Sequence, residues 1–198
     1  MFQLIETIRL LDGQFGNLRY HEQRMQRAMK EIFGVDRKVN LEEVLSTYSK
    51  PTLGLYKCRM VYDNKRNEVE FISYTVRPAH WLRIVVDDTI SYDHKFEDRR
   101  EIERDFKNRE NCDDVLIIKK GRVTDTSQAN IVFRRRNEWI TPASFLLPGT
   151  MRQSLLDRKT IIEEEIHVDE LSGFESFKLV NAMLMFDAPE RSIANIVP

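Results

Sequence analysis

The feature that most constrains the fold is a break in the strand and helix pattern at Arg77–His80, which contains Pro78. Proline lacks a backbone donor and disfavours helix in the residue before it, so the pattern favours a boundary here. A new strand-like run starts at Trp81, and both sides of the break mix strands with helices. The chain is therefore predicted to form two units, a small N-terminal α+β domain at residues 1–78 and a larger C-terminal domain at 79–198.

The first half contains an amphipathic pattern between strand-like runs. Apolar residues recur from Leu18 to Phe33 at helical spacing, and Gly34 follows as a stop signal. Asn40 followed by Glu43 predicts the capped start of a short helix. The elements expected before the boundary are a strand at 2–11, a turn at 12–13, helices at 18–33 and 41–45, and strands at 53–62 and 69–76.

The second half has no regular alternation of strands and helices and no glycine-rich turn after its first strand. A regular alternation and a glycine-rich turn are typical of dinucleotide-binding folds. Their absence from the sequence excludes that class and favours an α+β fold. The expected elements are strands at 81–86, 115–118, 131–135, 139–140 and 161–168, helices at about 97–107 and from about 150, and a final apolar stretch at 177–186.

Composition excludes several functions. Lysine and arginine number 31 against 32 acidic residues, a net charge of −1, so no global field favours nucleic acid or an anionic membrane. No apolar run approaches the roughly 18 residues of a membrane helix, and early charges at Glu6 and Arg9 argue against a secretory signal. Two cysteines without metal-ligand spacing signal neither a disulfide framework nor a metal site, which favours the cytoplasm.

The most informative stretch is the polar segment from Thr124 to Ile131, which lies between two apolar strands. It contains Asp125, Ser127, Gln128 and Ala129, and such a segment is used either by its own hydrogen bonds or by a ligand. Composition alone favours a capped, self-satisfied turn.

Three further places could carry chemistry. Pro148-Gly149-Thr150 runs into a helix, whose N-terminus could hold an anion or could form a routine turn. His21 and Arg24 lie three residues apart on one helix face. Lys95 follows a polar break, where a lysine is more often solvated but becomes a nucleophile if its surroundings lower its pKa.

In this order, these segments resemble the class IV aminotransferase family, over nearly the whole chain. Five motifs in register are far more specific than one. The matching segments are Leu4-Ile5-Glu6-Thr7-Ile8-Arg9 with Asp12-Gly13, His21-Glu22-Gln23-Arg24-Met25, His94-Lys95 with Arg99-Arg100, Gly121 to Ile131 after Asp113-Asp114-Val115-Leu116, and Leu147-Pro148-Gly149-Thr150-Met151-Arg152.

The resemblance implies two small α/β domains of the D-amino acid aminotransferase-like fold, with pyridoxal 5'-phosphate (PLP) between them. It implies that Lys95 links covalently to PLP and moves protons on the substrate, and that Arg24 binds the phosphate. Asp125 stands where the family usually has glutamate, the partner of the ring nitrogen. The remaining cofactor contacts would come from Ser127, Gln128, Ala129, Thr150 and Met151, while Arg59 is the candidate for a substrate carboxylate.

Within the family, the motif spelling is closest to 4-amino-4-deoxychorismate lyases. This implies conversion of 4-amino-4-deoxychorismate to 4-aminobenzoate and pyruvate on the route to folate, with aminodeoxychorismate synthase as a partner. The alternatives are an aminotransferase for branched-chain or D-amino acids, which uses the same motifs, and a cofactor-free scaffold. Family members are homodimers. The strand and turn that usually precede the Glu6 segment are absent here, which is expected either to open one side of the substrate entrance or to leave a sheet edge that a second subunit covers.

Overall fold

The computed structural model describes residues 3–36, 38–77 and 79–198, which form two compact units. The first unit comprises Met1–Val76 and His94–Asp98, and the second comprises Arg77–Asp93 and Arg99–Pro198. The division after Val76 lies beside the predicted boundary. The segment with Lys95 belongs to the first unit, whereas the sequence analysis placed it in the second domain. Residues 95–97 form backbone hydrogen bonds and a bridge with residues 3–5. No local pattern reveals this pairing, which accounts for the difference.

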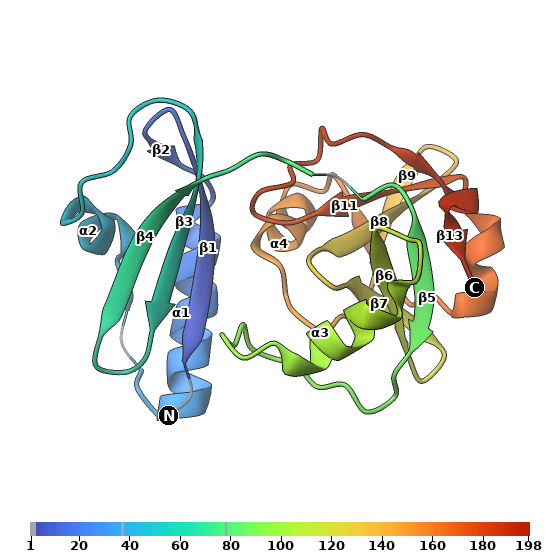
Figure 1. The fold of residues 1–198 in the computed structure, drawn as a ribbon, viewed down its shortest axis with the longest axis horizontal. Coiled ribbons are helices and arrows are strands. Elements are labelled where there is room, and N and C mark those ends of the chain that lie inside the picture. The colour runs from blue at the N-terminus through green and yellow to red at the C-terminus, as the bar shows by residue number, and fades with distance from the viewer. Residues whose placement is uncertain (1–2, 37, 78) are drawn as a thin grey trace. The chain divides into compact units, whose positions relative to one another are not determined.

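In the first unit, four antiparallel strands follow the order β2-β1-β3-β4 over the described residues (Figure 1). Alternate residues of β3 are buried, with Cys58, Met60 and Tyr62 facing a core shared with α1 and α2. The period of two in β3 and the helical spacing in α1 thus bury one face of each. The bounds are β1 Leu4–Leu11, β2 Gln14–Phe15, α1 Leu18–Phe33, α2 Leu41–Ser46, β3 Leu55–Tyr62 and β4 Asn67–Ser73.

The local signals in this half are confirmed. Asp12 and Gly13 have φ angles of 46° and 77°, as a two-residue hairpin turn requires. The helix at Leu18–Phe33 ends at Gly34 in the left-handed conformation, and the Asn40 side chain accepts a hydrogen bond from the Glu43 amide at 3.1 Å.

The second unit contains one mixed sheet of nine strands over the described residues. Its main path is β10-β9-β8-β7-β6-β5-β13, and β11 pairs with β8 and β12. The strands are β5 Leu82–Val86, β6 Asp114–Lys119, β7 Arg122–Thr126, β8 Asn130–Arg135, β9 Glu138–Pro142, β10 Ile162–Glu164, β11 Ser176–Val180, β12 Arg191–Ser192 and β13 Ile196–Val197.

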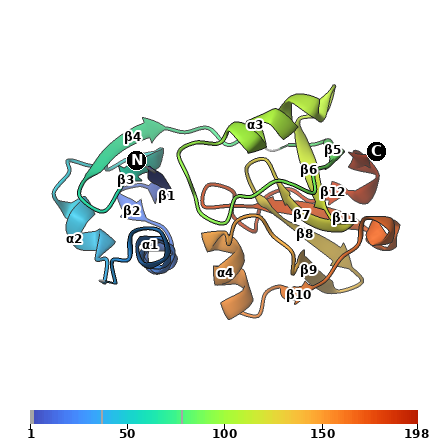
Figure 2. The same cartoon turned by 90° about the horizontal axis from the view of Figure 1, so that it is seen from below.

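Helices α3 Arg100–Phe106 and α4 Thr150–Asp157 lie on different sides of these strands (Figure 2). Short 3₁₀ turns occupy Lys107–Arg109, Val168–Gly173 and Ile193–Asn195. Met151 and Leu155 of α4 pack against Val132 of β8 and Val180 of β11, so the start of α4 rests on the sheet. In the part of the chain that the structure describes, no helix combines the length and the hydropathy needed to cross a bilayer.

Several predicted boundaries differ from those of the structure. The strands expected at 53–62 and 69–76 are Leu55–Tyr62 and Asn67–Ser73. The helix expected from residue 97 begins at Arg100, and the strand expected at 161–168 is limited to Ile162–Glu164. Most of the polar segment at 124–131 lies in β7 and β8, with a tight turn at residues 127–129. The polar residues of this segment other than the exposed Gln128 are buried, because the sheet and the turn satisfy their hydrogen bonds.

Candidate active site

A buried ion cluster in the first unit holds Arg24. Glu6 of β1 is fully buried and accepts hydrogen bonds from Arg24 Nε to Oε1 at 2.9 Å and from Arg24 Nη2 to Oε2 at 2.5 Å. His21 Nδ1 lies 2.6 Å from Glu6 Oε2, one helical turn before Arg24. The carboxylate therefore holds the guanidinium in a fixed two-bond geometry.

The charges in this cluster are set by burial and mutual contact. Burial would raise the pKa of Glu6, but the Arg24 charge and the contacts with His21 outweigh it and lower the pKa to about 2. Burial lowers the pKa of His21, and the positive charges of Arg24 and Lys95 lower it further, against the effect of Glu6. At neutral pH, a neutral His21 therefore donates from Nδ1 to the Glu6 carboxylate.

The segment that carries Lys95 is bound to the start of β1. Ile5 N donates to the Lys95 carbonyl at 2.9 Å, and Glu97 N donates to the Gln3 carbonyl at 2.9 Å. Phe96 lies between these two bonds, forms a bridge with Leu4 and packs against the core of the unit. Lys95 thus belongs to a short extra stretch of paired backbone.

Arg59 lies on β3, opposite Thr7 of β1 and Glu70 of β4. Its Nη2 donates to Glu97 Oε1 at 2.5 Å, and its Nη1 donates to Glu70 Oε1 at 3.3 Å. The guanidinium predicted to bind a substrate carboxylate is therefore already paired with two carboxylates of the chain itself.

In the second unit, Asp125 is 5% exposed and accepts three hydrogen bonds. Asn130 Nδ2 donates to Oδ1 at 2.7 Å, and the amides of Leu146 and Leu147 donate to Oδ2 at 2.9 and 3.0 Å. Burial raises the pKa of Asp125 to about 6, although these hydrogen bonds favour the ionised form. A carboxylate has about four acceptor positions, so it can accept one further donor.

Asn130 connects Asp125 to the turn that leads into α4. Its Nδ2 also donates to the Leu147 carbonyl at 3.0 Å. A Cβ added at Gly149 would lie 1.8 Å from Asn130 Oδ1, so only glycine allows this close approach. Thr150 and Met151 begin α4 immediately afterwards, and the first turn of this fully described helix contains no acidic residue. The turn, Asp125 and the start of α4 therefore form one hydrogen-bonded structure.

The turn at residues 127–129 is capped, as its composition predicted. Thr126 Oγ1 accepts from the Ala129 amide at 3.1 Å and donates to the Ala129 carbonyl at 3.2 Å. Arg99 Nη2 donates to the Ser127 carbonyl at 2.5 Å, and Asn181 Nδ2 donates to the Gln128 carbonyl at 3.0 Å. These bonds hold the turn backbone in place.

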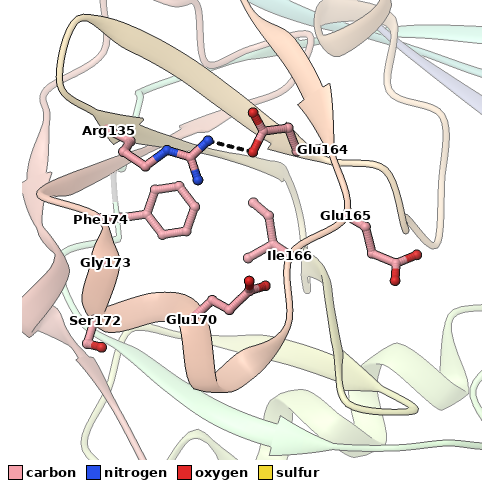
Figure 3. A pocket seen from close by; sticks show the side chains of 8 residues that line it. All are labelled: Arg135, Glu164, Glu165, Ile166, Glu170, Ser172, Gly173 and Phe174. Carbon is pink, nitrogen blue, oxygen red and sulfur yellow. Dashed lines mark hydrogen bonds and ion pairs between the residues drawn. The ribbon is translucent and has the colours of Figure 1, made fainter.

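A separate cavity of about 350 Å³ lies in the second unit (Figure 3). Arg135 pairs with Glu164 at 2.6 Å and lies over the Phe174 ring, while Glu170 accepts from the His167 amide. Over the described residues, its lining contains no predicted site residue. The lining residues are Arg135, Glu164, Glu165, Ile166, Glu170, Ser172, Gly173 and Phe174.

The structure thus brings Arg24, Lys95 and Arg59 into the first unit and gathers the other predicted residues in the second. The sequence analysis assigned no role to Glu6, Glu97 or Asn130. Glu6 carried a usable signal, because it occupies an inward position between the apolar residues Leu4 and Ile8 of a strand. The roles of Glu97 and Asn130 depend on partners distant in sequence or on tertiary geometry, which a strand pattern does not show.

Comparisons with known proteins identify the family of this chain. Residues 89–187 match the family model described as amino-transferase class IV. An uncharacterized protein of Haemophilus influenzae is 33% identical over 92% of this chain and 98% of its own length. A crystal structure from Haemophilus somnus, named "putative 4-amino-4-deoxychorismate lyase", has a TM-score of 0.87 and 34% identity, covering 94% of this chain and 98% of that one.

A structure from Mesorhizobium loti, named "Putative amino-acid aminotransferase", has a TM-score of 0.81 and 20% identity over the full length of both chains. This likeness concerns the fold. The family match and the fold define a PLP-dependent enzyme of fold type IV. The chain belongs to the class IV aminotransferase family.

The residues present fit PLP in their chemistry. A buried guanidinium and a helix start without acidic residues suit a phosphate, and Lys95 supplies an amine. Asp125 retains room for one donor such as a ring N–H, although its side chain is one methylene shorter than the glutamate that the family usually has.

Proposed function

We propose that this enzyme is a lyase that converts 4-amino-4-deoxychorismate to 4-aminobenzoate and pyruvate. The observation that carries the proposal is the likeness, over 94% of the chain and at 34% identity, to the Haemophilus somnus protein named for this activity. The motif spelling from Glu6 to Arg152 supports the same choice.

We propose the following cofactor contacts. Lys95 binds PLP covalently, and Arg24 with the start of α4 at Thr150 and Met151 binds the phosphate. Asp125 accepts from the ring nitrogen, while Ser127, Gln128 and Ala129 line the ring and phosphate. When bound, PLP delocalises the negative charge that develops on the carbon bearing the substrate amine.

Lys95 then acts as base and acid. Its amine takes the proton from the substrate carbon that carries the amino group, and the electron pair forms a ring double bond as the neighbouring carbon–oxygen bond breaks. The enolpyruvyl group leaves with that bonding pair, and a proton from Lys95 completes pyruvate. Aromatisation of the ring drives the reaction forward.

Transamination is the second candidate, favoured by the family model itself. Lys95 would then hand on the same proton without loss of the enolpyruvyl group. Water would supply the oxygen of the keto acid that leaves, and the amino group would stay behind for transfer to a second substrate. A branched-chain or D-amino acid would be the substrate in that case. The two activities separate after removal of the same proton, so Lys95 is required for both.

A coupled assay tests the choice. Chorismate, glutamine and aminodeoxychorismate synthase are supplied, and 4-aminobenzoate and pyruvate are measured in equal amounts. Lys95→Ala should abolish both products. Glutamate formation from 2-oxoglutarate and a neutral amino acid, without 4-aminobenzoate, would instead establish the aminotransferase.

We also propose a cytoplasmic homodimer that receives its substrate from aminodeoxychorismate synthase. The family resemblance supports both the dimer and the partner. Light scattering of the purified protein, with and without the synthase, measures both associations. A monomeric mass at micromolar concentration would contradict the dimer.

A further inference from the structure

The backbone around Lys95 lies outside any regular strand of the sheet, yet it is held at several points. Backbone hydrogen bonds flank the lysine on both sides, from Ile5 N to its own carbonyl and from Glu97 N to the Gln3 carbonyl. His94 Nε2 lies 3.1 Å from Glu31 Oε2 of α1. Phe96 packs against the core of the first unit.

An ion pair between side chains connects the segment that carries Lys95 to β3. Arg59 Nη2 donates to Glu97 Oε1 at 2.5 Å, and the side chains are 28% and 36% exposed. Glu97 is two residues after Lys95, so this ion pair holds the C-terminal side of the segment that carries Lys95 against β3, which lies between β1 and β4. β3 pairs with β1 along eight residues, which makes it a firm anchor.

We infer that Arg59 is a positioning residue, which acts through Glu97 to hold the Lys95 segment against β1. This inference rests on the proposed role of Lys95 as the residue that binds PLP. An amine that attacks an aldehyde must be presented within a narrow range of positions, so a loose segment lowers the fraction of productive encounters.

The same geometry argues against substrate binding by Arg59. Its guanidinium already faces the Glu97 and Glu70 carboxylates, so a substrate carboxylate would have to displace one of them and would meet the other as a like charge. The two roles predict different effects. Loss of a positioning residue changes the PLP concentration at which Lys95 is trapped, whereas loss of a substrate-binding residue raises the KM for the substrate.

The chain offers a matched control. Glu70 contacts the same guanidinium at 3.3 Å from the neighbouring strand β4, and among the described residues its ion pair is with Arg59 rather than with the segment that carries Lys95. Arg59→Gln and Glu97→Gln each remove the connection to the segment, while Glu70→Gln removes a partner of Arg59 and leaves that connection intact.

The first readout is hydrogen exchange of the full-length apoprotein. The Ile5 and Glu97 amides report directly on the two bonds that flank Lys95. Arg59→Gln and Glu97→Gln should each speed their exchange about twofold to fivefold, the range of a partly exposed ion pair, and Glu70→Gln should not. The double variant should exchange no faster than either single one, because both remove the same pair.

The second readout is the trapping of PLP on Lys95 by borohydride, followed by peptide mass analysis. The PLP concentration for half-maximal trapping should rise about twofold to fivefold in Arg59→Gln and Glu97→Gln, and high salt should shift the wild type in the same direction. The exchanged pair Arg59→Glu with Glu97→Arg should restore both readouts towards wild type.

Unchanged exchange of the Ile5 and Glu97 amides in Arg59→Gln, together with a raised KM, would overturn the inference and assign Arg59 to the substrate. Failure of wild-type Lys95 to trap PLP would instead refute the proposed function. The exchange data would still show whether the ion pair holds the segment, so the two failures can be told apart.

Discussion

At the scale of single residues, Asn130 illustrates how one amide can support a whole turn. Its side chain donates both to Asp125 and to the Leu147 carbonyl in a buried environment. Asn130→Ala leaves both acceptors without this donor, so we expect a loss of about 1–3 kcal/mol in the free energy of unfolding, measured by urea denaturation.

The pKa of Asp125 should also rise above about 6 in Asn130→Ala, because one hydrogen bond to its ionised form is lost. Gln153→Ala, which removes an exposed hydrogen bond within α4, serves as the control and should change stability little. An Asn130→Ala protein as stable as wild type would show that the network adds nothing to the fold.

Glu6 predicts a pH dependence of stability. Its pKa of about 2 in the folded protein lies below the ordinary value of 4.5, so the folded state binds fewer protons than the unfolded state between these values. Stability from this group is complete above pH 4.5 and is lost as the pH falls towards 2, by about 3 kcal/mol in all.

Glu6→Gln should therefore be less stable than wild type at pH 7, since Arg24 loses a buried counter-charge. The difference should shrink between pH 4.5 and 2, measured by urea unfolding at several pH values. Asp36→Asn, which breaks an exposed pair with Lys30, should show little difference at any pH. A gap that stays constant down to pH 2 would contradict the assigned pKa.

At the scale of elements, the start of α4 depends on the close approach of Gly149 to Asn130. The Gly149 φ angle of −70° suits any residue, so a substitution there is resisted by contact rather than by backbone strain. Because a Cβ would meet Asn130 Oδ1 at 1.8 Å, Gly149→Ala should cost about 1–3 kcal/mol in thermal or urea unfolding.

Gly173→Ala is the matched control, because an added Cβ there meets no atom within 4 Å. Adding Asn130→Ala to Gly149→Ala should cost less than the sum of the two changes, since the smaller side chain makes room for the new methyl group. Strict additivity would show that the two residues do not share this contact.

Elements with local signals were predictable from sequence. The helix at Leu18–Phe33 has its predicted bounds because apolar spacing and Gly34 both act within a few residues. The buried strand β7 was harder, because Thr124 and Asp125 look like loop residues until their partners on other segments are known. The membership of Lys95 in the first unit depends on pairing with β1, about 90 residues earlier in the chain, which no local pattern contains.

At the scale of the whole molecule, the motifs carried information that composition lacked. The spelling around Glu6, Lys95 and Asp125 led to the family, which the family model and the relatives confirm. Composition pointed to no particular partner and could not suggest PLP, because the residues that fit PLP are common types whose meaning lies in their order. Partners such as Glu97 for Arg59 required the structure, since an ion pair between distant residues leaves no pattern along the chain.

Binding of PLP should stabilise the chain, because a ligand that binds only the folded state shifts the equilibrium towards that state. A ligand that binds only the folded state at about 100 times its Kd adds about 2.7 kcal/mol to the free energy of unfolding. Thermal unfolding with excess PLP should therefore shift to higher temperature in the wild type. Pyridoxal without phosphate should give a smaller shift, because it lacks the group proposed to contact Arg24 and the start of α4.

Arg24→Gln should reduce the advantage of PLP over pyridoxal, while Lys95→Ala should lower the shift from both compounds, because both carry the aldehyde that this amine is proposed to bind. These different patterns separate phosphate binding from covalent attachment without any measurement of catalysis. Equal stabilisation of the wild type by PLP and pyridoxal would contradict the phosphate role of Arg24, since a charged guanidinium beside the phosphate must favour the phosphorylated form.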